Sequence, residues 1–323
     1  MIGWGVVGPG AIASGFADAM ELVSGGSIVA VASRSRERAA DYADRYSIPH
    51  RFGSYGEIAD DPNVDVVYVA TPQSRHEEDT VALLEAGKHV LCEKPFALNA
   101  LQASRMIDAA RTRGLFLMEA IWSRFLPAYR VLTDLLEEQR IGEPVLVEAD
   151  FGFRAQPSAE NRLFRPELGG GSLLDLGIYP LQLCSLVLGL PLSAVAEGVV
   201  GGTGVDEQVV AVLRHPGDRL GVIKSAITVN MACTARIAGT AGHIELPAMM
   251  HCPNSVICRS ADGIEDIDCS YEGNGLRFEI EEVQRCLDAG RLESDRMPLA
   301  ETLVFAETLD AVRRQIGLTF PVE

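Results

Sequence analysis

The chain has 323 residues, enough for two domains or for one large domain, and 47% of them are hydrophobic, which is ample for a core. Its 28 Lys and Arg residues stand against 45 Asp and Glu residues, and the net charge of −17 argues against nucleic acid and against an anionic membrane surface as partners. A small phosphate ligand is not excluded, because local backbone amides and a few cations suffice to bind it.

The seven cysteines are scattered and form no C-x-x-C motif, and the N-terminus lacks the basic region of a signal peptide. We therefore expect free thiols and a cytoplasmic location. His251, Cys252 and Cys258 form the one His/Cys cluster, which is a poor zinc site, so we expect no metal. Residues 176–196 carry no charge and are long enough to span a membrane, but they include Pro180, and we interpret them as a buried helix followed by a turn.

The first strand, turn and helix carry the strongest motif. Residues 4–7 form an apolar run typical of a buried strand, Gly8-Pro9-Gly10 breaks it, and residues 11–20 continue as a helix. In this context Gly8-x-Gly10-x-x-Ala13 predicts a dinucleotide-binding turn. Gly8 permits the tight turn, Gly10 lets the backbone approach a pyrophosphate, and Ala13 packs closely on the strand. The phosphates would meet the first N–H groups of the helix, those of Ala11, Ile12 and Ala13. The alternative is a glycine-rich turn of any α/β domain.

The second strand, at 27–32, ends at Ser33-Arg34-Ser35, where a dinucleotide fold selects its cofactor. An acid there would bind the ribose 2′-hydroxyl and repel a 2′-phosphate, and this sequence has none. Ser33 can donate a hydroxyl hydrogen bond, Arg34 can hold a phosphate, and Arg38 lies nearby. The pattern favours NADP over NAD; the alternative is a solvated basic start to the helix at 36–46.

Strands and helices continue to alternate up to residue 118, which predicts a doubly wound parallel sheet. The remaining strands are 65–70, 89–92 and 115–118, and the helices between them are 76–86 and 100–113. Ligands of such sheets gather at the carboxyl ends of the strands, where Gly8, Ser33, Thr71-Pro72 and Lys94 are expected.

The pattern changes after Glu119 to short strands separated by turns, which predicts an α+β domain with a mostly antiparallel sheet. The predicted strands are 144–153, 199–200, 208–213, 219–225, 234–238 and 243–246, and the helices are 127–139, 275–289 and 298–316. We predict two tightly joined domains, 1–120 and 121–323, with the helix at about 298–316 packing back on the first.

Two places carry side chains suited to chemistry at a carbonyl. Lys94, between Glu93 and Pro95 at a strand end, could donate to a reacting oxygen or lower the pKa of a neighbour; the alternative is a surface lysine at a proline turn, which a cis bond could shape. Asp175 and Tyr179 are four residues apart, so a helix would place a carboxylate and a phenol on one face, as orienter and general acid/base. Alternatively, Asp175 caps the helix together with Ser172, and Pro180 bends it.

These motifs occur in the order and spacing of the glucose–fructose oxidoreductase/inositol dehydrogenase/MocA (Gfo/Idh/MocA) family, which the chain resembles over essentially its whole length. Residues 118–125 and 312–321 are similar to the branch that contains dimeric dihydrodiol dehydrogenase and NADP-dependent xylose dehydrogenases. Many family members carry His where this chain has Tyr179, and that branch uses Tyr. The resembling motifs are Gly8-x-Gly10-x-x-Ala13, Ser33-Arg34, Ala70-Thr71-Pro72-x-x-x-His76, Glu93-Lys94-Pro95 and Gly169-Gly170-Gly171-x-x-x-Asp175-x-Gly177-x-Tyr179.

The resemblance implies an N-terminal Rossmann domain and a C-terminal α+β domain whose large open sheet makes a homodimer or homotetramer. It also implies Tyr179 as general acid/base, assisted by Lys94, with Asp175 nearby. It implies that Phe153, Tyr179 and Asp175 meet the substrate, the alternative for Phe153 being a core aromatic. The further cofactor contacts it implies are Thr71, Pro72, His76, Glu93, Lys94, Trp122 and Arg124.

We therefore predict an NADP(H)-dependent oxidoreductase that transfers a hydride to or from a sugar, another small polyol or a trans-dihydrodiol. Two alternatives stay open, a non-catalytic NADPH-binding regulator and a nicotinamide-dependent glycosidase.

Overall fold

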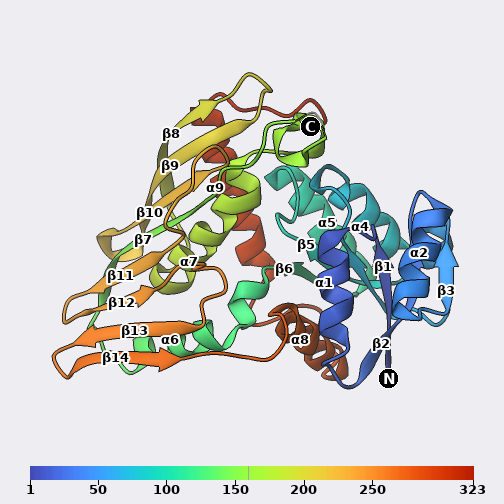
Figure 1. The fold of residues 1–323 in the computed structure, drawn as a ribbon, viewed down its shortest axis with the longest axis horizontal. Coiled ribbons are helices and arrows are strands. Elements are labelled where there is room, and N and C mark those ends of the chain that lie inside the picture. The colour runs from blue at the N-terminus through green and yellow to red at the C-terminus, as the bar shows by residue number, and fades with distance from the viewer. Residues whose placement is uncertain (159) are drawn as a thin grey trace. The chain divides into compact units, whose positions relative to one another are not determined.

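The computed structural model describes residues 1–158 and 160–323, which divide into two compact units (Figure 1). Unit 1 comprises Met1–Phe125 and Glu272–Leu303, and unit 2 comprises Leu126–Tyr271 and Val304–Glu323.

Unit 1 contains a six-stranded parallel sheet in the order β3-β2-β1-β4-β5-β6. The central strands are apolar and almost completely buried, as expected for a parallel sheet covered on both faces. The strands are β1 (Ile2–Val7), β2 (Gly26–Ala32), β3 (His50–Phe52), β4 (Val66–Val69), β5 (His89–Glu93) and β6 (Leu117–Ala120). The helices are α1 (Ala11–Met20), α2 (Arg36–Tyr46), α3 (Tyr55–Ala59), α4 (His76–Glu85), α5 (Ala100–Arg113) and α8 (Leu276–Asp288), with short 3-10 helices η1 (Gln73–Arg75) and η2 (Trp122–Phe125).

The segment Glu272–Leu303 belongs to unit 1, although the sequence analysis placed it in the second domain. Its helix α8 packs on α1, and the Asn274 amide donates a 2.9 Å hydrogen bond to the Gly15 carbonyl of α1. Farther along, the Leu292 carbonyl accepts from the Leu117 N–H of β6 at 3.1 Å. Because these contacts join residues more than 170 positions apart, no local sequence pattern predicts them.

Unit 2 contains an eight-stranded sheet in the order β14-β13-β12-β11-β7-β10-β9-β8, in which only the β7–β10 pair is parallel. The strands are β7 (Pro144–Gly152), β8 (Ser193–Val200), β9 (Asp206–His215), β10 (Arg219–Ala226), β11 (Ala235–Gly239), β12 (His243–Leu246), β13 (Ser255–Ser260) and β14 (Gly263–Asp268). The helices are α6 (Pro127–Glu137) and α7 (Ile178–Leu188), and α9 (Leu299–Gln315) begins in unit 1 and ends in unit 2.

The predicted fold class is confirmed, with a doubly wound parallel sheet followed by a large, mostly antiparallel one. The predicted bounds of α1, α2, α5 and β12 agree with the structure. The sequence analysis missed β3, α3, β13 and β14. Nearly every residue of β14 is exposed, so the alternation of buried and exposed side chains that reveals a strand is absent there.

The uncharged stretch at 176–196 is a buried helix followed by a turn, as predicted. α7 packs on β7 and β10 and is buried on almost all sides. The helical stretch Pro166–Leu188 is long and apolar enough to cross a membrane, but 94% of its apolar window is buried inside the protein. Such burial is what a core helix requires, and it explains the composition without a membrane.

Candidate active site

The turn between β1 and α1 has the backbone that its glycines predict. Gly8 has a φ of +84°, and a Cβ atom there would lie 2.8 Å from the Ala70 carbonyl oxygen, so the position requires glycine. Gly10 is the N-cap of α1 and brings no side chain to the N–H groups of the first turn, which contains no acid. These features suit a diphosphate at the helix end. The N–H groups concerned belong to Ala11, Ile12 and Ala13, and Ala13 is completely buried.

Hydroxyl and guanidinium groups follow the end of β2. Ser33 is buried, and its hydroxyl accepts a hydrogen bond from the Ser35 N–H at 3.2 Å. Ser35 caps α2 by accepting from the Arg38 N–H at 3.3 Å, and the Arg38 guanidinium donates to the Pro9 carbonyl, also at 3.3 Å. Arg38 thereby connects the start of α2 with the glycine turn, while Arg34 is exposed to solvent.

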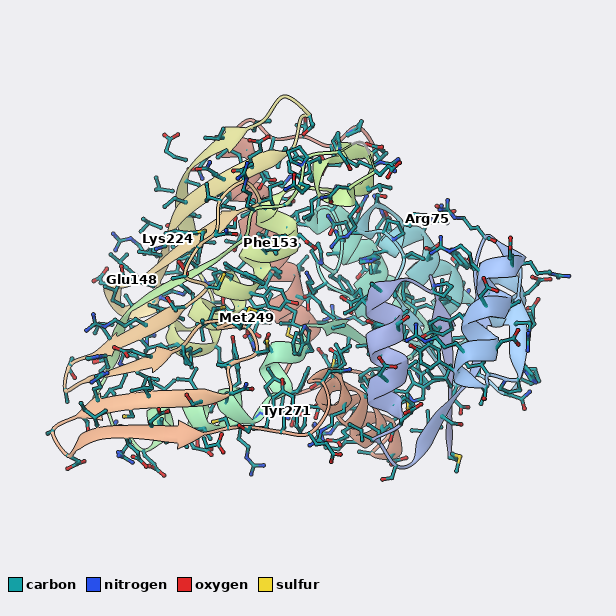
Figure 2. The ribbon with its side chains drawn as sticks, viewed as in Figure 1. Arg75, Glu148, Phe153, Lys224, Met249 and Tyr271 are labelled. Atoms are coloured by element: carbon teal, nitrogen blue, oxygen red, sulfur yellow. The ribbon has the colours of Figure 1, made fainter. Side chains whose placement is uncertain are left out.

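Two residues that the sequence analysis did not consider belong to this region, Tyr55 of α3 and Arg75 of η1. Figure 2 labels Arg75. Burial raises the pKa of the Tyr55 phenol, and the positive charges of Arg34, Arg75 and Arg38 oppose that rise. Arg75 itself is paired with Glu78 at 2.9 Å and with Asp79 at 2.7 Å, so its charge is largely matched by its neighbours in α4. For Arg75, the available signal was its place four residues after Thr71, at the carboxyl end of β4.

The turn after β4 is built around Thr71 and His76. The Thr71 hydroxyl is buried and has no hydrogen-bond partner among residues 1–158 and 160–323, which makes it a donor and acceptor for a bound group. The His76 ring contacts the carbonyls of Thr71 and Pro95, each at 2.9 Å, and is 1% exposed. Burial lowers the pKa of His76. His76 thus connects the turn after β4 with the turn after β5, and both of its ring nitrogens are directed at the protein backbone. Pro72, between them, is half-buried.

Glu93 fixes the backbone beside Lys94. Its carboxylate accepts hydrogen bonds from the Tyr68 hydroxyl and, at 3.1 Å, from the Lys94 N–H. The Lys94–Pro95 bond is cis, which the sequence analysis named as one option, and Lys94 is half-buried. Glu93 is therefore the residue that orients the Lys94 turn.

Beyond β6, the charges are paired inside unit 1. Arg124 of η2 is buried and forms a 2.6 Å ion pair with Glu301, so its charge is already matched within the protein. Glu119 accepts a 3.0 Å hydrogen bond from the Phe96 N–H, and burial raises the pKa of Glu119 to about 7. Trp122, predicted with Arg124 to contact the cofactor, is half-buried in the same 3-10 helix.

In unit 2 a π-helical turn, η5 (Leu173–Gly177), carries Asp175 and leads into α7. The wide turn comes just before Pro180, which has no N–H to offer the carbonyl four residues earlier. The Asp175 carboxylate is buried and accepts a 2.8 Å hydrogen bond from the Arg162 guanidinium. Arg162 had no signal in the sequence, since it lies 13 residues upstream, at the start of the short 3-10 helix η3 (Arg162–Phe164).

The start of η5 is capped by Asp206, the first residue of β9, which the sequence analysis also missed. Its carboxylate accepts from the Leu173 N–H at 2.6 Å and from the Ser172 hydroxyl at 2.8 Å. Ser172 itself makes no side-chain cap. Asp206 is completely buried, and burial raises its pKa to about 6. A Cβ at Gly171 would lie 2.1 Å from the Asp206 carboxylate, so glycine makes room for the cap.

Tyr179, in the first turn of α7, lies in a cluster of aromatic rings. Its centroid is 5.6 Å from that of Phe151 and 5.1 Å from that of His251, and the Phe151 and His251 rings are stacked at 4.3 Å. Tyr179 is 5% exposed. Phe153, by contrast, is 39% exposed beyond the end of β7 (Figure 2) and is not a core aromatic.

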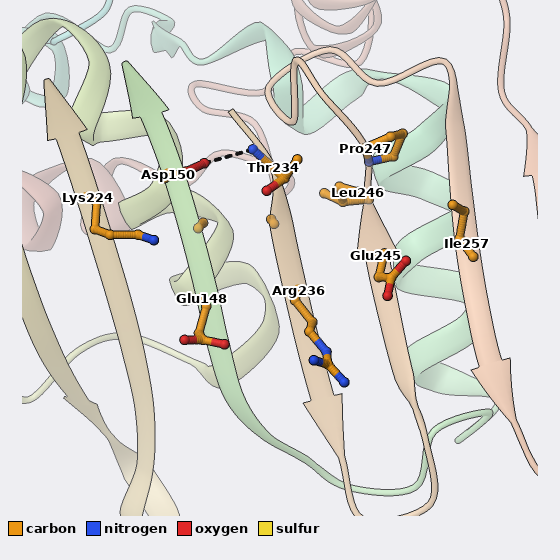
Figure 3. Close-up of a pocket in the computed structure, with 11 residues that line it drawn as sticks. Glu148, Asp150, Lys224, Thr234, Arg236, Glu245, Leu246, Pro247 and Ile257 are labelled. Atoms are coloured by element: carbon orange, nitrogen blue, oxygen red, sulfur yellow. Dashed lines mark hydrogen bonds between the residues drawn. The ribbon is translucent and has the colours of Figure 1, made fainter. Parts of the chain in front are cut away.

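A pocket of about 370 Å³ opens on the eight-stranded sheet of unit 2 (Figure 3). Charges of both signs line it, among them Glu148, Lys224, Arg236 and Glu245. It was not predicted. The described residues contain no group of three or more His, Cys, Asp or Glu side chains arranged to hold a metal ion.

The predicted site residues thus fall into two groups. Unit 1 holds the glycine turn, Ser33, Arg34, Arg38, Thr71, Pro72, His76, Glu93, Lys94, Trp122 and Arg124, and unit 2 holds Phe153, Asp175 and Tyr179.

Comparison with known proteins matches both halves of the chain. Residues 2–121 match the family model described as "Oxidoreductase family, NAD-binding Rossmann fold", and residues 129–245 match the "GFO/IDH/MocA C-terminal domain". The chain is 38% identical to trans-1,2-dihydrobenzene-1,2-diol dehydrogenase of Danio rerio over 98% of this chain and 97% of the relative. It is also 38% identical to the Homo sapiens enzyme of that name, over 98% of each chain.

Solved structures with a similar fold include a 3-ketoreductase and an aldose-aldose oxidoreductase. A 3-ketoreductase from Actinomadura kijaniata, in complex with NADP and TDP-benzene, superposes with a TM-score of 0.89 at 27% identity over 98% of each chain. An aldose-aldose oxidoreductase from Caulobacter crescentus, complexed with glycerol, superposes with a TM-score of 0.88 at 26% identity over 97% of each chain.

Proposed function

We propose, starting from the fact that this chain belongs to the Gfo/Idh/MocA oxidoreductase family, that it is an NADP(H)-dependent dehydrogenase or reductase acting on a trans-dihydrodiol or a sugar. The observation that carries the catalytic part is Tyr179, a phenol held among rings at the start of α7, one turn after the Asp175–Arg162 ion pair. A phenol so held can move a proton to or from a hydroxyl group.

Features of unit 1 support NADP(H) as the cofactor. The β1–α1 turn fits a diphosphate, and the buried Thr71 hydroxyl, which has no partner in the described part of the chain, offers a hydrogen bond at the end of β4. Residues 33–36 contain no acid that would repel a 2′-phosphate, and Arg34 and Arg38 are exposed just after the end of β2. The 3-ketoreductase of similar fold binds NADP. When bound, the nicotinamide accepts or supplies the hydride.

The proposed oxidation removes one proton and one hydride from the substrate. The Tyr179 phenolate takes the proton of the substrate hydroxyl, the hydride leaves the same carbon, and the carbon–oxygen bond becomes a carbonyl. We assign to Lys94, as the family resemblance implies, the role of a cation that favours the phenolate. Glu93 supports this role, because it holds the Lys94 backbone through the Lys94 N–H.

The names of the relatives support this substrate class, and dihydrodiols are the first to test. The relatives at 38% identity are named for trans-1,2-dihydrobenzene-1,2-diol, whereas the 3-ketoreductase and the aldose-aldose oxidoreductase are 26–27% identical. Phe153, exposed near the end of β7, offers a ring on which a cyclic substrate could stack.

We also propose a homodimer or homotetramer formed through the eight-stranded sheet, in the cytoplasm. The surface of this sheet exposes apolar side chains on β8, β9 and β14, among them Val195 at 71% and Ile264 at 69%. A monomeric mass in light scattering at working concentration would contradict the assembly.

The deciding experiment is turnover of the purified protein with NADP and with NAD, followed by nicotinamide absorbance. The probes are trans-1,2-dihydrobenzene-1,2-diol, pentoses and hexoses, each tested as alcohol and as the corresponding carbonyl compound. Reduction of NADP by one class supports the proposal and identifies the substrate, and equal rates with NAD would contradict the cofactor preference. Binding of NADPH without turnover in either direction would favour a non-catalytic regulator, and hydrolysis of a chromogenic glycoside without net NADPH would favour a glycosidase.

A further inference from the structure

The ring cluster around Tyr179 contains a histidine to which the proposed reaction assigns no role. The His251 ring is stacked on Phe151 at an interplanar angle of 16° and inclined at 50° to Tyr179. All three side chains are less than 9% exposed. A phenol packed against two rings at these distances can rotate only if they move, because offset and tilted contacts fill the space beside it.

A buried hydrogen-bond chain connects the backbone next to His251 with the helix that carries Tyr179. The Gln182 amide of α7 donates to the Tyr129 hydroxyl at 3.1 Å, and that hydroxyl donates to the Met250 carbonyl, also at 3.1 Å. Gln182 and Tyr129 are at most 1% exposed. The residue before His251 is therefore tied to α7 one turn beyond Tyr179.

The segment 249–252 is held from other directions as well. The Met250 N–H donates to the Cys233 carbonyl at 2.8 Å, and the Cys252 N–H donates to the Met249 carbonyl at 2.7 Å. Met249 (Figure 2) has a φ of +66°, a conformation that is unfavourable for a non-glycine residue and persists where the surroundings enforce it. Contacts with the surrounding residues thus hold the turn that carries His251 in a conformation that its own sequence does not favour.

The histidine ring is also held at its edge by Cys252. The Cys252 sulfur lies 3.5 Å from Nε2 of His251, and burial raises the pKa of this thiol to about 11, so it stays a thiol. The stacking on Phe151, the fixed turn and the Cys252 thiol all restrain the His251 ring.

We propose that His251 is a positioning residue for Tyr179, acting through its ring and not as a base. This inference rests on the proposed function, and it adds a residue to that site. Gln182 and Tyr129 serve the same end, because they fix the turn that presents the ring.

The test compares His251→Ala with His251→Phe, using NADP and trans-1,2-dihydrobenzene-1,2-diol as the probe pair. Because a displacement of about 1 Å can cost on the order of 100-fold, we expect His251→Ala to lower kcat about 10-fold to 100-fold while NADPH binding, measured by fluorescence, is unchanged. His251→Phe keeps a flat ring and should retain kcat within about 3-fold with an unaltered pH profile. Loss of activity in His251→Phe equal to that in His251→Ala would overturn the proposal, as would full activity of His251→Ala.

His243→Ala is the matched control, since His243 of β12 lies in the same unit and is paired with Glu245 at 3.2 Å. It should leave kcat unchanged. A double-mutant cycle in melting temperature, with His251→Ala and Tyr179→Leu, tests the contact without any turnover. We expect the double variant to lose less than the sum of the single losses, and additive losses would overturn the proposal even if the probe is not a substrate. Wild-type turnover in Tyr179→Phe would instead refute the proposed function and leave this cycle to decide the contact.

Discussion

The glycine turn of unit 1 and the Tyr179 region of unit 2 are built in different ways. Gly8, Gly10 and the first turn of α1 lie within six consecutive residues, and the requirement for glycine follows from one neighbouring strand end. Tyr179 depends instead on Asp206 through the cap of η5 and on Phe151 and His251 through ring contacts. A site made by local backbone geometry can be recognised from its spacing, whereas a site made by distant side chains shows only its central residue.

The largest expected effect lies in the Tyr179 region. Tyr179→Phe keeps the ring contacts and removes the hydroxyl, so we expect turnover to fall about 1,000-fold because the proton has no acceptor, while NADPH binding and the melting temperature stay unchanged. Steady-state kinetics, fluorescence titration and thermal unfolding together check this. Turnover like that of the wild type would remove Tyr179 from the mechanism.

In the glycine turn, Gly8→Ala tests whether backbone geometry alone makes the site. The added Cβ would meet the Ala70 backbone at 2.8 Å in a left-handed conformation, so we expect a loss of about 3 kcal/mol in the free energy of unfolding and loss of NADPH binding.

Gly87→Ala is a matched control for that substitution, because Gly87 has a φ of +86° and a Cβ there would have no neighbour within 4 Å. It should cost about 1 kcal/mol, the conformational part alone, and leave NADPH binding intact. Equal losses in the free energy of unfolding for the two variants, measured by chemical denaturation, would show that the contact with the Ala70 backbone does not contribute to the effect.

The same contrast explains what the sequence could and could not predict. The bounds of α1, α2 and α5 and the identities of Gly8, Ser33 and Thr71 followed from periodicity and from the order of strand ends. Tyr55 and Arg75 were missed because α3 and η1 are too short to show a period.

In unit 2, the signals that were missing are long-range ones. Asp206 caps a turn 33 residues earlier, and His251 meets Tyr179 across 72 residues of chain, so neither spacing has a local signature. Arg124, expected to contact the cofactor, is engaged by Glu301 from the other end of the chain. Pairing at such separations is set by tertiary packing, which a single sequence does not display.

The Asp206 cap gives a pH test of the long-range part of the site. Its pKa is 3.8 in an exposed reference and about 6 in the fold, because burial disfavours the charge. The folded state therefore binds the proton more tightly, so the contribution of Asp206 to stability is complete below about pH 4 and falls as the pH rises through 6. Two pKa units correspond to about 3 kcal/mol.

Asp206→Asn keeps an oxygen for the Leu173 N–H and cannot ionise. We expect the wild type to lose about 3 kcal/mol relative to this variant between pH 4 and pH 7, measured as the difference between two series of urea denaturations. Parallel pH curves for the two proteins would mean that the carboxylate is stabilised by its hydrogen bonds as much as it is destabilised by burial.

The smallest expected effect is that of replacing Arg34, which tests whether the segment after β2 alone selects the cofactor. Arg34 was predicted from its place after β2 and is exposed, whereas Arg75 follows the end of β4 and is paired there with Glu78 and Asp79. Arg34→Ala should therefore raise the KM for NADP about 10-fold, the worth of one charge-assisted contact, and leave that for NAD unchanged. Arg45→Ala, at the other end of α2 where the guanidinium lies over the Tyr46 ring, is the control and should change neither value. If the 10-fold rise in the KM for NADP appears only when Arg34 and Arg75 are replaced together, Arg75, which follows a different strand, can substitute for Arg34. The cofactor site would then depend on more than the segment that follows β2.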